Sequence, residues 1–177
     1  MTDLARLYLS GRKVRNWWRR GIWCRIAIAI SLALAVSFSA WADFSGKVVG
    51  VADGDSITVL RDREQVKVRL VEIDAPEMGQ AFGNRSKQAL EDLVKGKEVR
   101  VVEHGHDKYR RTLGRIYRGD LDVNAEQVRQ GMAWVFRQYA KDATLYPIEA
   151  EAKEQKRGLW RDPEPVPPWE WRKAASN

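Results

Sequence analysis

The stretch VKVRLVEIDAPE, residues 66–77, decides the fold of this chain. In its first half Val66, Val68 and Leu70 alternate with charged residues, which is typical of a β-strand that turns one face to a hydrophobic core. Proline has no N–H to donate to a neighbouring strand, and it favours an extended backbone at the residue before it. The sequence therefore predicts a strand over residues 65–74 that stops before Pro76.

Charged residues gather where this strand ends, namely Arg69, Asp74 and Glu77. Arg69 lies five positions before Asp74, so the two side chains would point to opposite faces of an unbroken strand. We expect the end of the strand to bend and to turn both side chains inward. Two carboxylates and one guanidinium group would then lie within reach of a single point.

Short apolar runs separated by turn residues make up the rest of the domain. A D-G-D turn, residues 53–55, joins the apolar runs 47–51 and 56–60, which indicates a β-hairpin that leads into the strand 65–74. Gly96 stands where a glycine commonly ends a helix. The other predicted elements are helices over residues 87–95, 122–130 and 146–156, strands over 98–103 and 112–117, and an extended piece over 133–136.

Five short strands with one helix between the third and the fourth predict a mainly β fold, a five-stranded OB-fold Greek-key barrel with three helices. We divide the chain into a leader (residues 1–42), the barrel domain (43–162) and a tail rich in proline and tryptophan (163–177). The tail is predicted to be extended, and its Trp169 and Trp171 could pack back on the domain or bind a ligand.

The formal net charge of +7 is concentrated in the leader. Residues 1–42 hold seven basic residues and one acid, whereas the rest of the chain holds 24 basic and 23 acidic residues. Net charge therefore identifies no partner for the folded domain, and any affinity for a polyanion must come from a local cluster. Cys24, the only cysteine, also lies in the leader, which excludes disulfides and thiolate zinc sites from the domain.

The leader has the three parts of a secretory signal peptide. A basic region reaches Arg25, an apolar run covers residues 26–38, and AWA at residues 40–42 has the small-x-small pattern of a cleavage site. We expect cleavage between Ala42 and Asp43, and export to the periplasm or the medium. The alternative is an uncleaved membrane anchor, for which this segment is at the lower limit of length.

Asp53, Asp55, Asp74 and Glu77 bring carboxylates to one hairpin turn and to one neighbouring strand end. Hard oxygen ligands gathered in a small space suit Ca²⁺ or Mg²⁺. Taken singly, each acid has a simpler explanation, because aspartate is common in turns and at the ends of strands. The carboxylates alone leave both interpretations open.

Arginines add a second kind of chemistry to this group. Arg69 lies on the strand, and Arg111 ends the polar segment DKYRR, residues 107–111. Guanidinium groups beside a divalent cation stabilise the charge that develops on phosphate oxygens when a phosphodiester is cleaved. The alternative is that Arg69 pairs with Glu72 or Asp74 and only neutralises surface charge.

Five segments together carry a resemblance to a known family. In chain order they are VADGDS (51–56), RLVEIDAPE (69–77), DKYRR (107–111), VNAEQVRQGMA (123–133) and AEAKEQKRGLW (150–160). Each is weak alone, but in this order they resemble the thermonuclease (staphylococcal nuclease-like) family over residues 47–160. The resemblance implies a calcium-dependent nuclease on a five-stranded barrel, acting on DNA and RNA with a preference for single strands.

The resemblance also implies roles for individual acids. Asp55 and Asp74 would ligate Ca²⁺ together with the backbone carbonyl of Ala75, and Asp53 would act through a water molecule. Glu77 would hold or deprotonate the attacking water. Water would attack phosphorus in line with the 5′ oxygen, which leaves, so that the product carries a 3′-phosphate.

Basic and aromatic residues complete the implied site. Arg69 and Arg111 would grip the scissile phosphate, Lys108 and Tyr109 would contact the neighbouring terminal phosphate, and Tyr139 would offer a platform for a base. No obligate protein partner is implied. The alternative function is a non-catalytic OB-fold module that binds single-stranded nucleic acid, but the complete catalytic set favours the enzyme.

The chain departs from the family pattern at three places. Arg110 replaces the glycine that is common before the second arginine, so the turn either avoids a positive φ or is strained. Arg137 stands near the place of an expected aromatic residue, and the loop after Glu77 is shorter than in the best-known member. None of these departures removes a catalytic group.

Overall fold

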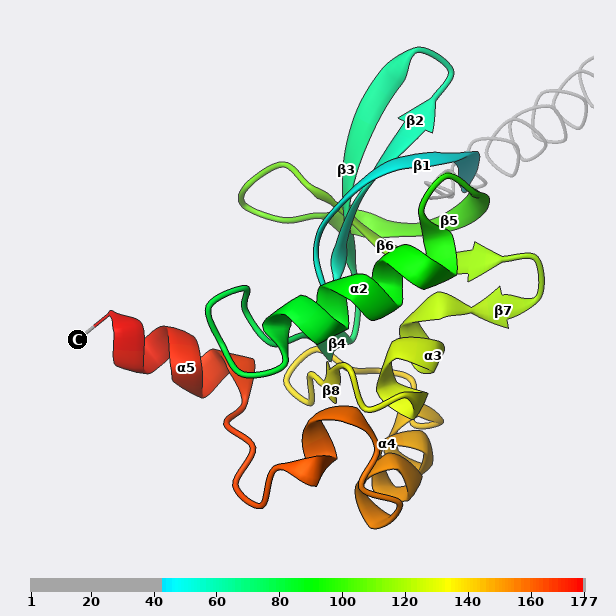
Figure 1. Cartoon of the computed structure of the whole chain (residues 1–177). Coiled ribbons are helices and arrows are strands. Elements are labelled where there is room, and N and C mark those ends of the chain that lie inside the picture. Colours follow the sequence, from blue (N-terminus) through cyan, green and yellow to red (C-terminus); the bar gives the residue numbers. More distant parts are fainter. Residues whose placement is uncertain (1–42, 177) are drawn as a thin grey trace, which may run out of the picture. The chain divides into compact units, whose positions relative to one another are not determined.

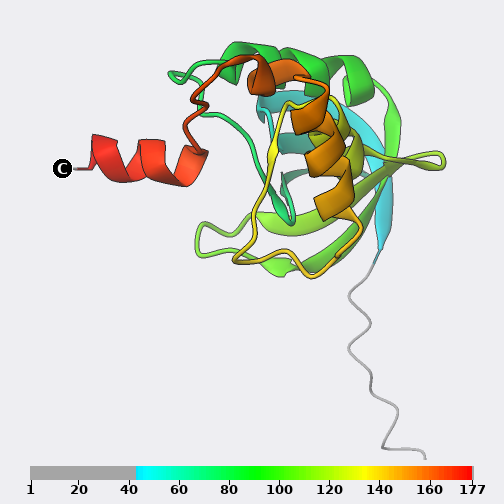
Figure 2. The same cartoon turned by 90° about the horizontal axis from the view of Figure 1, so that it is seen from below.

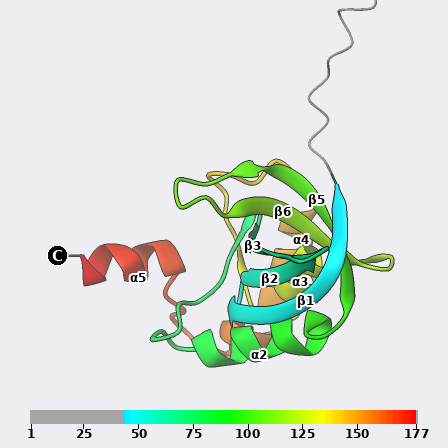
Figure 3. The same ribbon diagram turned by 90° about the horizontal axis from the view of Figure 1, so that it is seen from above.

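The computed structural model describes residues 43–176, and in this part of the chain a closed β-barrel is flanked by helices (Figures 1 and 3). The barrel strands are β1 (Phe44–Asp53), β2 (Ser56–Arg61), β3 (Glu64–Leu70), β5 (Glu98–His106) and β6 (Thr112–Arg118). Antiparallel pairing runs in the order β3-β2-β1-β5-β6, and a parallel pairing of β3 with β6 closes the barrel. The predicted five-stranded barrel is confirmed.

Alternate residues of the strands fill the interior of the barrel. Val48, Val59, Val68, Val101 and Ile116 come from five different strands and are each at most 1% exposed. Burying side chains of this size contributes about 1.5–3 kcal/mol each relative to leaving them in water. The pattern of alternation that predicted the strands is thus the pattern of the core.

The strand predicted over residues 65–74 is not continuous. β3 ends at Leu70, and the chain bends before a separate short strand β4 (Ile73–Asp74), which pairs with β8 (Trp134–Val135). Glu72 occupies the bend at φ +66°, a left-handed conformation that is uncommon for glutamate. The bend that we expected is therefore present, but it breaks the strand instead of curving it.

Contacts of Glu72 hold the bend in place. Its backbone carbonyl accepts a hydrogen bond from Phe136 N (2.8 Å), and its carboxylate accepts hydrogen bonds from the backbone N–H groups of Lys141 (2.7 Å) and Asp142 (2.9 Å). Arg115 of β6 donates to the same carboxylate at 3.0 Å. The segment after β8 and the barrel wall thus both fix the point where the strand turns.

Between residues 43 and 158 the chain forms three α-helices, as the sequence predicted, but their ends differ from the prediction. α2 begins at Gly83 and not at residue 87, and β5 continues to His106 past its predicted end at residue 103. The Asp122 side chain caps α3 by accepting a hydrogen bond from Ala125 N at 3.0 Å. The further elements are α2 (Gly83–Val94), β7 (Leu121–Asp122), α3 (Val123–Arg129), α4 (Leu145–Glu154), the 3₁₀ helix η1 (Gly158–Arg161) and α5 (Pro168–Ala175).

α5 corrects the prediction that the tail is extended. Pro168 occupies the first turn of this helix, a position where the missing N–H of proline is harmless, and no proline or glycine follows before its end. α3 and α4 lie at the lower end of the barrel in Figure 1, and α4 faces the viewer in Figure 2. In all views α5 lies beside the loop that joins β4 to α2 (Figures 1 to 3).

Within residues 43–176 no helix is long and apolar enough to span a membrane.

Asn124 at the start of α3 ties the bend to the barrel wall. Its side chain is 1% exposed, accepts a hydrogen bond from Ile116 N (3.0 Å) and donates one to the carbonyl of Val71 (2.9 Å). Both backbone groups would lose these bonds if the amide were removed. Asn124 is therefore a structural residue of the VNA segment and not the helix cap.

Replacing Asn124 with alanine should lower the free energy of unfolding by about 2–3 kcal/mol, because two buried backbone groups lose their partners. Urea denaturation followed by far-UV circular dichroism measures the change. The exposed Asp120→Ala variant, in the turn before the same helix, is the control and should unfold at the wild-type midpoint. Equal midpoints for both variants would contradict the role given to Asn124.

Candidate active site

The bend at residue 72 brings Arg69 next to both buried aspartates. Arg69 Nη1 donates to Asp55 Oδ1 at 2.6 Å, and Nη2 donates to Asp74 Oδ1 at 2.7 Å. Although burial acts against it, the carboxylates of Asp55 and Asp74 raise the pKa of the Arg69 guanidinium, which therefore stays charged. The pairing of Arg69 with Asp74 is thus part of a buried cluster and not a surface ion pair.

Asp55 and Asp74 are almost fully shielded from solvent, at 2% and 0% exposure. Besides Arg69, Asp55 accepts hydrogen bonds from Ser56 Oγ (3.2 Å) and from Ala75 N (2.7 Å). Burial raises the pKa of Asp55 to about 7 despite the opposing effect of Arg69. Additional positive charge beside Asp55 would favour its ionised form.

Close packing of the D-G-D turn positions Asp55. A Cβ atom on Gly54 would lie 1.8 Å from Ser86 Oγ and 2.7 Å from Ala75 Cβ, so only glycine allows the turn to approach α2. Gln127 of α3 is fully buried and donates to the carbonyls of Gly54 (2.7 Å) and Ser86 (3.2 Å). The sequence pattern missed Ser86 and Gln127, because buried polar residues inside helices carry no local signal.

Asp53 keeps its carboxylate within the turn. Its Oδ1 accepts a hydrogen bond from Asp55 N at 3.0 Å, the turn chemistry that its sequence context predicts. Asp53 therefore lies next to the buried aspartates without bonding to Arg69.

Glu77 joins the cluster through a residue that the sequence did not indicate. Arg172 of α5 donates through Nη1 to Glu77 Oε1 (2.7 Å) and Asp74 Oδ1 (3.2 Å), and through Nη2 to Asp74 Oδ2 (2.7 Å). Hydrogen bonds to Asp74, and then to Glu77, raise the pKa of Arg172 despite partial burial. No local pattern could find this contact, since it joins residues 95 and 98 positions apart.

Arg111 reaches the cluster from the turn between β5 and β6. Asp107 accepts hydrogen bonds from Arg111 Nε (2.8 Å) and from the backbone N–H groups of Arg111 and Tyr109 (2.9 Å each). Although slight burial acts the other way, the hydrogen bonds from Arg111 hold the pKa of Asp107 below its usual value. Arg111 Nη1 lies 3.5 Å from Ser56 Oγ, which itself donates to Asp55.

The other predicted contact residues lie at the surface. Tyr109 is 68% exposed, with Lys108 Nζ 5.0 Å and Arg111 Cζ 5.7 Å from the centre of its ring. Tyr139 is 60% exposed and packs edge-on against Phe136 at 4.8 Å. Lys108 and Tyr109 thus lie in the turn of Arg111, whereas Tyr139 makes no hydrogen bond to the acidic cluster within the described residues.

The chemistry of the cluster fits a hard cation. Asp55 and Asp74 supply buried carboxylate oxygens, and the bond from Ala75 N to Asp55 places the backbone of Ala75 beside them. Within residues 43–176 no three His, Cys, Asp or Glu side chains gather in a metal-binding arrangement. A cation here would therefore depend on two carboxylates, backbone carbonyl oxygen and water.

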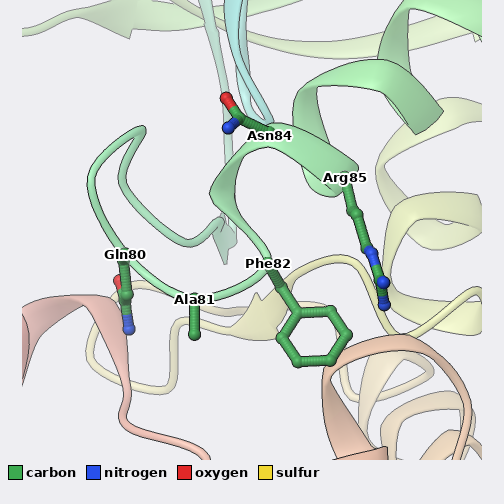
Figure 4. A pocket seen from close by; sticks show the side chains of 5 residues that line it. All are labelled: Gln80, Ala81, Phe82, Asn84 and Arg85. Carbon is green, nitrogen blue, oxygen red and sulfur yellow. The ribbon is translucent and has the colours of Figure 1, made fainter.

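A surface hollow lies beside the loop that carries Glu77, since Gln80 in its lining accepts a hydrogen bond from Glu77 N at 3.2 Å. It has a volume of about 430 Å³ and is lined by Gln80, Ala81, Phe82, Asn84 and Arg85 (Figure 4). The Arg85 guanidinium lies 5.2 Å from the ring centre of Phe82, and the lining includes no carboxylate, histidine or nucleophile. The hollow therefore adds no catalytic group to the site.

One family model and several known proteins match most of the region that the structure describes. The family model described as staphylococcal nuclease homologue matches residues 67–162. The chain is 48% identical over 162 residues to a micrococcal nuclease of Shigella flexneri, covering 85% of this chain and 93% of that protein. It is 49% identical over 132 residues to an uncharacterized endonuclease of Escherichia coli O157:H7 (74% and 86% covered) and 44% identical over 164 residues to protein ParB of E. coli (86% and 92%).

Arg110 adopts φ +63° in the turn that carries Arg111, so the substitution of the usual glycine does leave a strained backbone. Arg110→Gly should raise the free energy of unfolding by up to about 1 kcal/mol, because glycine adopts this conformation without steric conflict. Chemical denaturation measures the difference. Lys108→Gly, in the same turn at negative φ, is the matched control and should be neutral or destabilising. A loss of stability in Arg110→Gly would show that the turn is not strained.

Proposed function

Because the chain belongs to the staphylococcal nuclease homologue family and is a nuclease, we propose that it is a calcium-dependent phosphodiesterase that hydrolyses DNA and RNA and leaves 3′-phosphate products. One observation supports this most strongly. Asp55 and Asp74 are buried, and Arg69 bonds to both, next to Glu77 on the loop that follows. Carboxylates that would hold a cation, a guanidinium group that would bind a phosphate and a carboxylate that would hold water therefore belong to one group of side chains.

Asp55 and Asp74 would hold the calcium ion, with the backbone carbonyl of Ala75 and with Asp53 acting through a water molecule. Burial makes the charged form of Asp55 unfavourable, and a divalent cation would offset that penalty. When bound, the cation supplies Lewis-acid polarisation of a phosphate oxygen. Ser56 Oγ and Ala75 N keep the Asp55 carboxylate in a fixed orientation.

Glu77 would hold the attacking water and accept its proton. The side chain is 40% exposed, so water from the solvent reaches it directly. Attack on phosphorus in line with the 5′ oxygen breaks the P–O5′ bond and leaves the phosphate on the 3′ side. A carboxylate is a weak base at neutral pH, so orienting the water is the larger part of this role.

Arg69 and Arg111 would bind the non-bridging oxygens of the scissile phosphate. Both guanidinium groups are held by carboxylates, Arg69 by Asp55 and Asp74 and Arg111 by Asp107, so little reorganisation is needed when charge develops. Planar donors of this kind can bridge two phosphate oxygens.

Lys108 and Tyr109 would contact the adjacent terminal phosphate, and Tyr139 would stack on a base. The exposure of Tyr109 and Tyr139 leaves their rings available for such contacts. Stacking on a base requires an unpaired nucleotide, which supports a preference for single strands.

Export and removal of the leader are part of the proposal. The basic region, the apolar run and the AWA sequence of residues 40–42 support cleavage before Asp43, with the mature enzyme in the periplasm or the medium.

Cleavage of single-stranded DNA should require Ca²⁺ and stop when a calcium chelator is added. Glu77→Gln and Arg69→Ala should each lower kcat by a factor of about 10² to 10⁴, because one loses the water-holding carboxylate and the other a phosphate donor. Glu98 and Arg63 are exposed, and the variants Glu98→Gln and Arg63→Ala are the matched controls. Both control variants should cleave at the wild-type rate. Undiminished cleavage by both site variants would refute the site assignment, and cleavage that is insensitive to the chelator would refute the calcium requirement.

The chemistry at the cut is tested by the ends of the products. In-line attack with loss of the 5′ oxygen predicts oligonucleotides with a 3′-phosphate and a 5′-hydroxyl. A DNA polymerase should therefore extend them only after phosphatase treatment, and a kinase should label their 5′ ends directly. Products that are extended without phosphatase would contradict the proposed bond cleavage.

A further inference from the structure

Arg172 occupies the carboxylates on which the proposed mechanism depends. Nη2 of its guanidinium group donates to Asp74 Oδ2 at 2.7 Å. Nη1 donates both to Asp74 Oδ1 (3.2 Å) and to Glu77 Oε1 (2.7 Å). Asp74 Oδ1 already accepts from Arg69, so donors surround both oxygens of this carboxylate. A positive group of the chain itself thus lies against the side chains proposed to hold the cation and the water.

Aromatic contacts dock α5 in this position. Trp169 stacks on Phe136 with parallel rings (5.5 Å between centres, 2° between planes) and meets the edge of Trp134 at 5.8 Å. Upstream of the helix, Gln80 Nε2 donates to the carbonyl of Val166 at 2.6 Å, and the Gln80 side chain points to the tail in Figure 4. The tail therefore lies on the same loop that carries Glu77.

The helix is short, and two of its large side chains are partly exposed. α5 has only eight residues, too few for a stable helix by itself in water. Trp171 is 40% exposed and the Arg172 side chain 41%. A crevice of about 70 Å³ also remains between the tail and the loop, lined by Gln80, Phe82, Pro165 and Trp171 among others. The short length of the helix, the exposure of its side chains and the crevice beneath it favour a helix that docks reversibly.

We propose that residues 163–176 are an intramolecular inhibitory arm, in which Arg172 closes the active site by bonding Asp74 and Glu77 until cation and nucleic acid displace it. The inference rests on the proposed function, since it assigns regulation to the same carboxylates. Calcium needs oxygens of Asp74 that Arg172 bonds, and Arg172 also bonds one of the two Glu77 oxygens that could hold water. The phosphates of a substrate in turn offer Arg172 another anion, so both ligands favour the undocked arm.

The size of the effect follows from the population of the docked arm. The apparent dissociation constant of calcium equals its intrinsic value divided by the fraction of molecules with an open site. The ion pairs are partly exposed, so docking of this kind shifts the equilibrium by about one order of magnitude at most. Removal of the Arg172 guanidinium should therefore lower the dissociation constant of calcium roughly three- to tenfold.

The test compares the whole mature chain with three variants, Arg172→Ala, Trp169→Ala and Lys173→Ala. Lys173 is the exposed neighbour of Arg172, and its loss changes the net charge by the same amount. Calorimetric titration with CaCl₂ in the absence of nucleic acid gives the affinity, amide hydrogen exchange of residues 169–175 reports docking, and cleavage is measured at limiting calcium. Arg172→Ala and Trp169→Ala should bind calcium more tightly, exchange faster and cleave faster, whereas Lys173→Ala should behave as wild type.

Two results would contradict the proposal of an inhibitory arm. Unchanged calcium affinity and unchanged exchange in Arg172→Ala would show that the contact does not close the site. Wild-type affinity with lower cleavage would make Arg172 a substrate-binding residue instead.

Failure of the proposed function gives a different result. If the wild-type chain binds no calcium, the cofactor assignment fails, and the arm is judged by exchange and by cleavage with the divalent cation that does support activity. If no cation supports cleavage, the mechanism fails and an inhibitory role fails with it.

Discussion

The left-handed turn at Glu72 is the constraint on which the site depends. A strand that continued in regular alternation would place Arg69 and Asp74 on opposite faces of the sheet. The turn at φ +66° separates β3 from β4 and lets Arg69 bond Asp74 at 2.7 Å. The surrounding structure stabilises the unusual conformation, because Arg115 and two backbone N–H groups bind the Glu72 carboxylate. The same turn therefore separates two strands of the fold and brings two residues of the site together.

The turn at Glu72 brings Asp74 and Arg69 to Asp55, which the packed D-G-D turn positions, so that two buried carboxylates lie beside one guanidinium group. Burial of an unpaired charge is very unfavourable, and paired charges still require good geometry. Arg69 meets this requirement for both Asp55 and Asp74, and Arg172 adds a second guanidinium group on Asp74. In the proposed function a cation from solution would compete with Arg172 for Asp74, and that competition would link the tail to the active site.

Much of the site could be predicted from the sequence because its parts are local. The D-G-D turn, the strand end and the DKYRR turn each carry their candidate residues within a few positions, so the order of the motifs was enough to assign Asp55, Arg69 and Arg111 to one candidate site. Other contributions could not be predicted. Ser86 and Gln127 position the turn from inside helices, and Arg172 approaches from the end of the chain.

The sequence by itself determined the barrel, because alternation of apolar residues with period 2 specifies which face of each strand is buried. It also determined the set of acids and arginines and, through their order, the family. Only the tertiary structure decided where the strand breaks, since the left-handed conformation of Glu72 depends on partners from residues 115 to 142. It also decided that α5 folds back on the site. Contacts between segments nearly one hundred residues apart depend on the path of the whole chain, and no local pattern encodes that path.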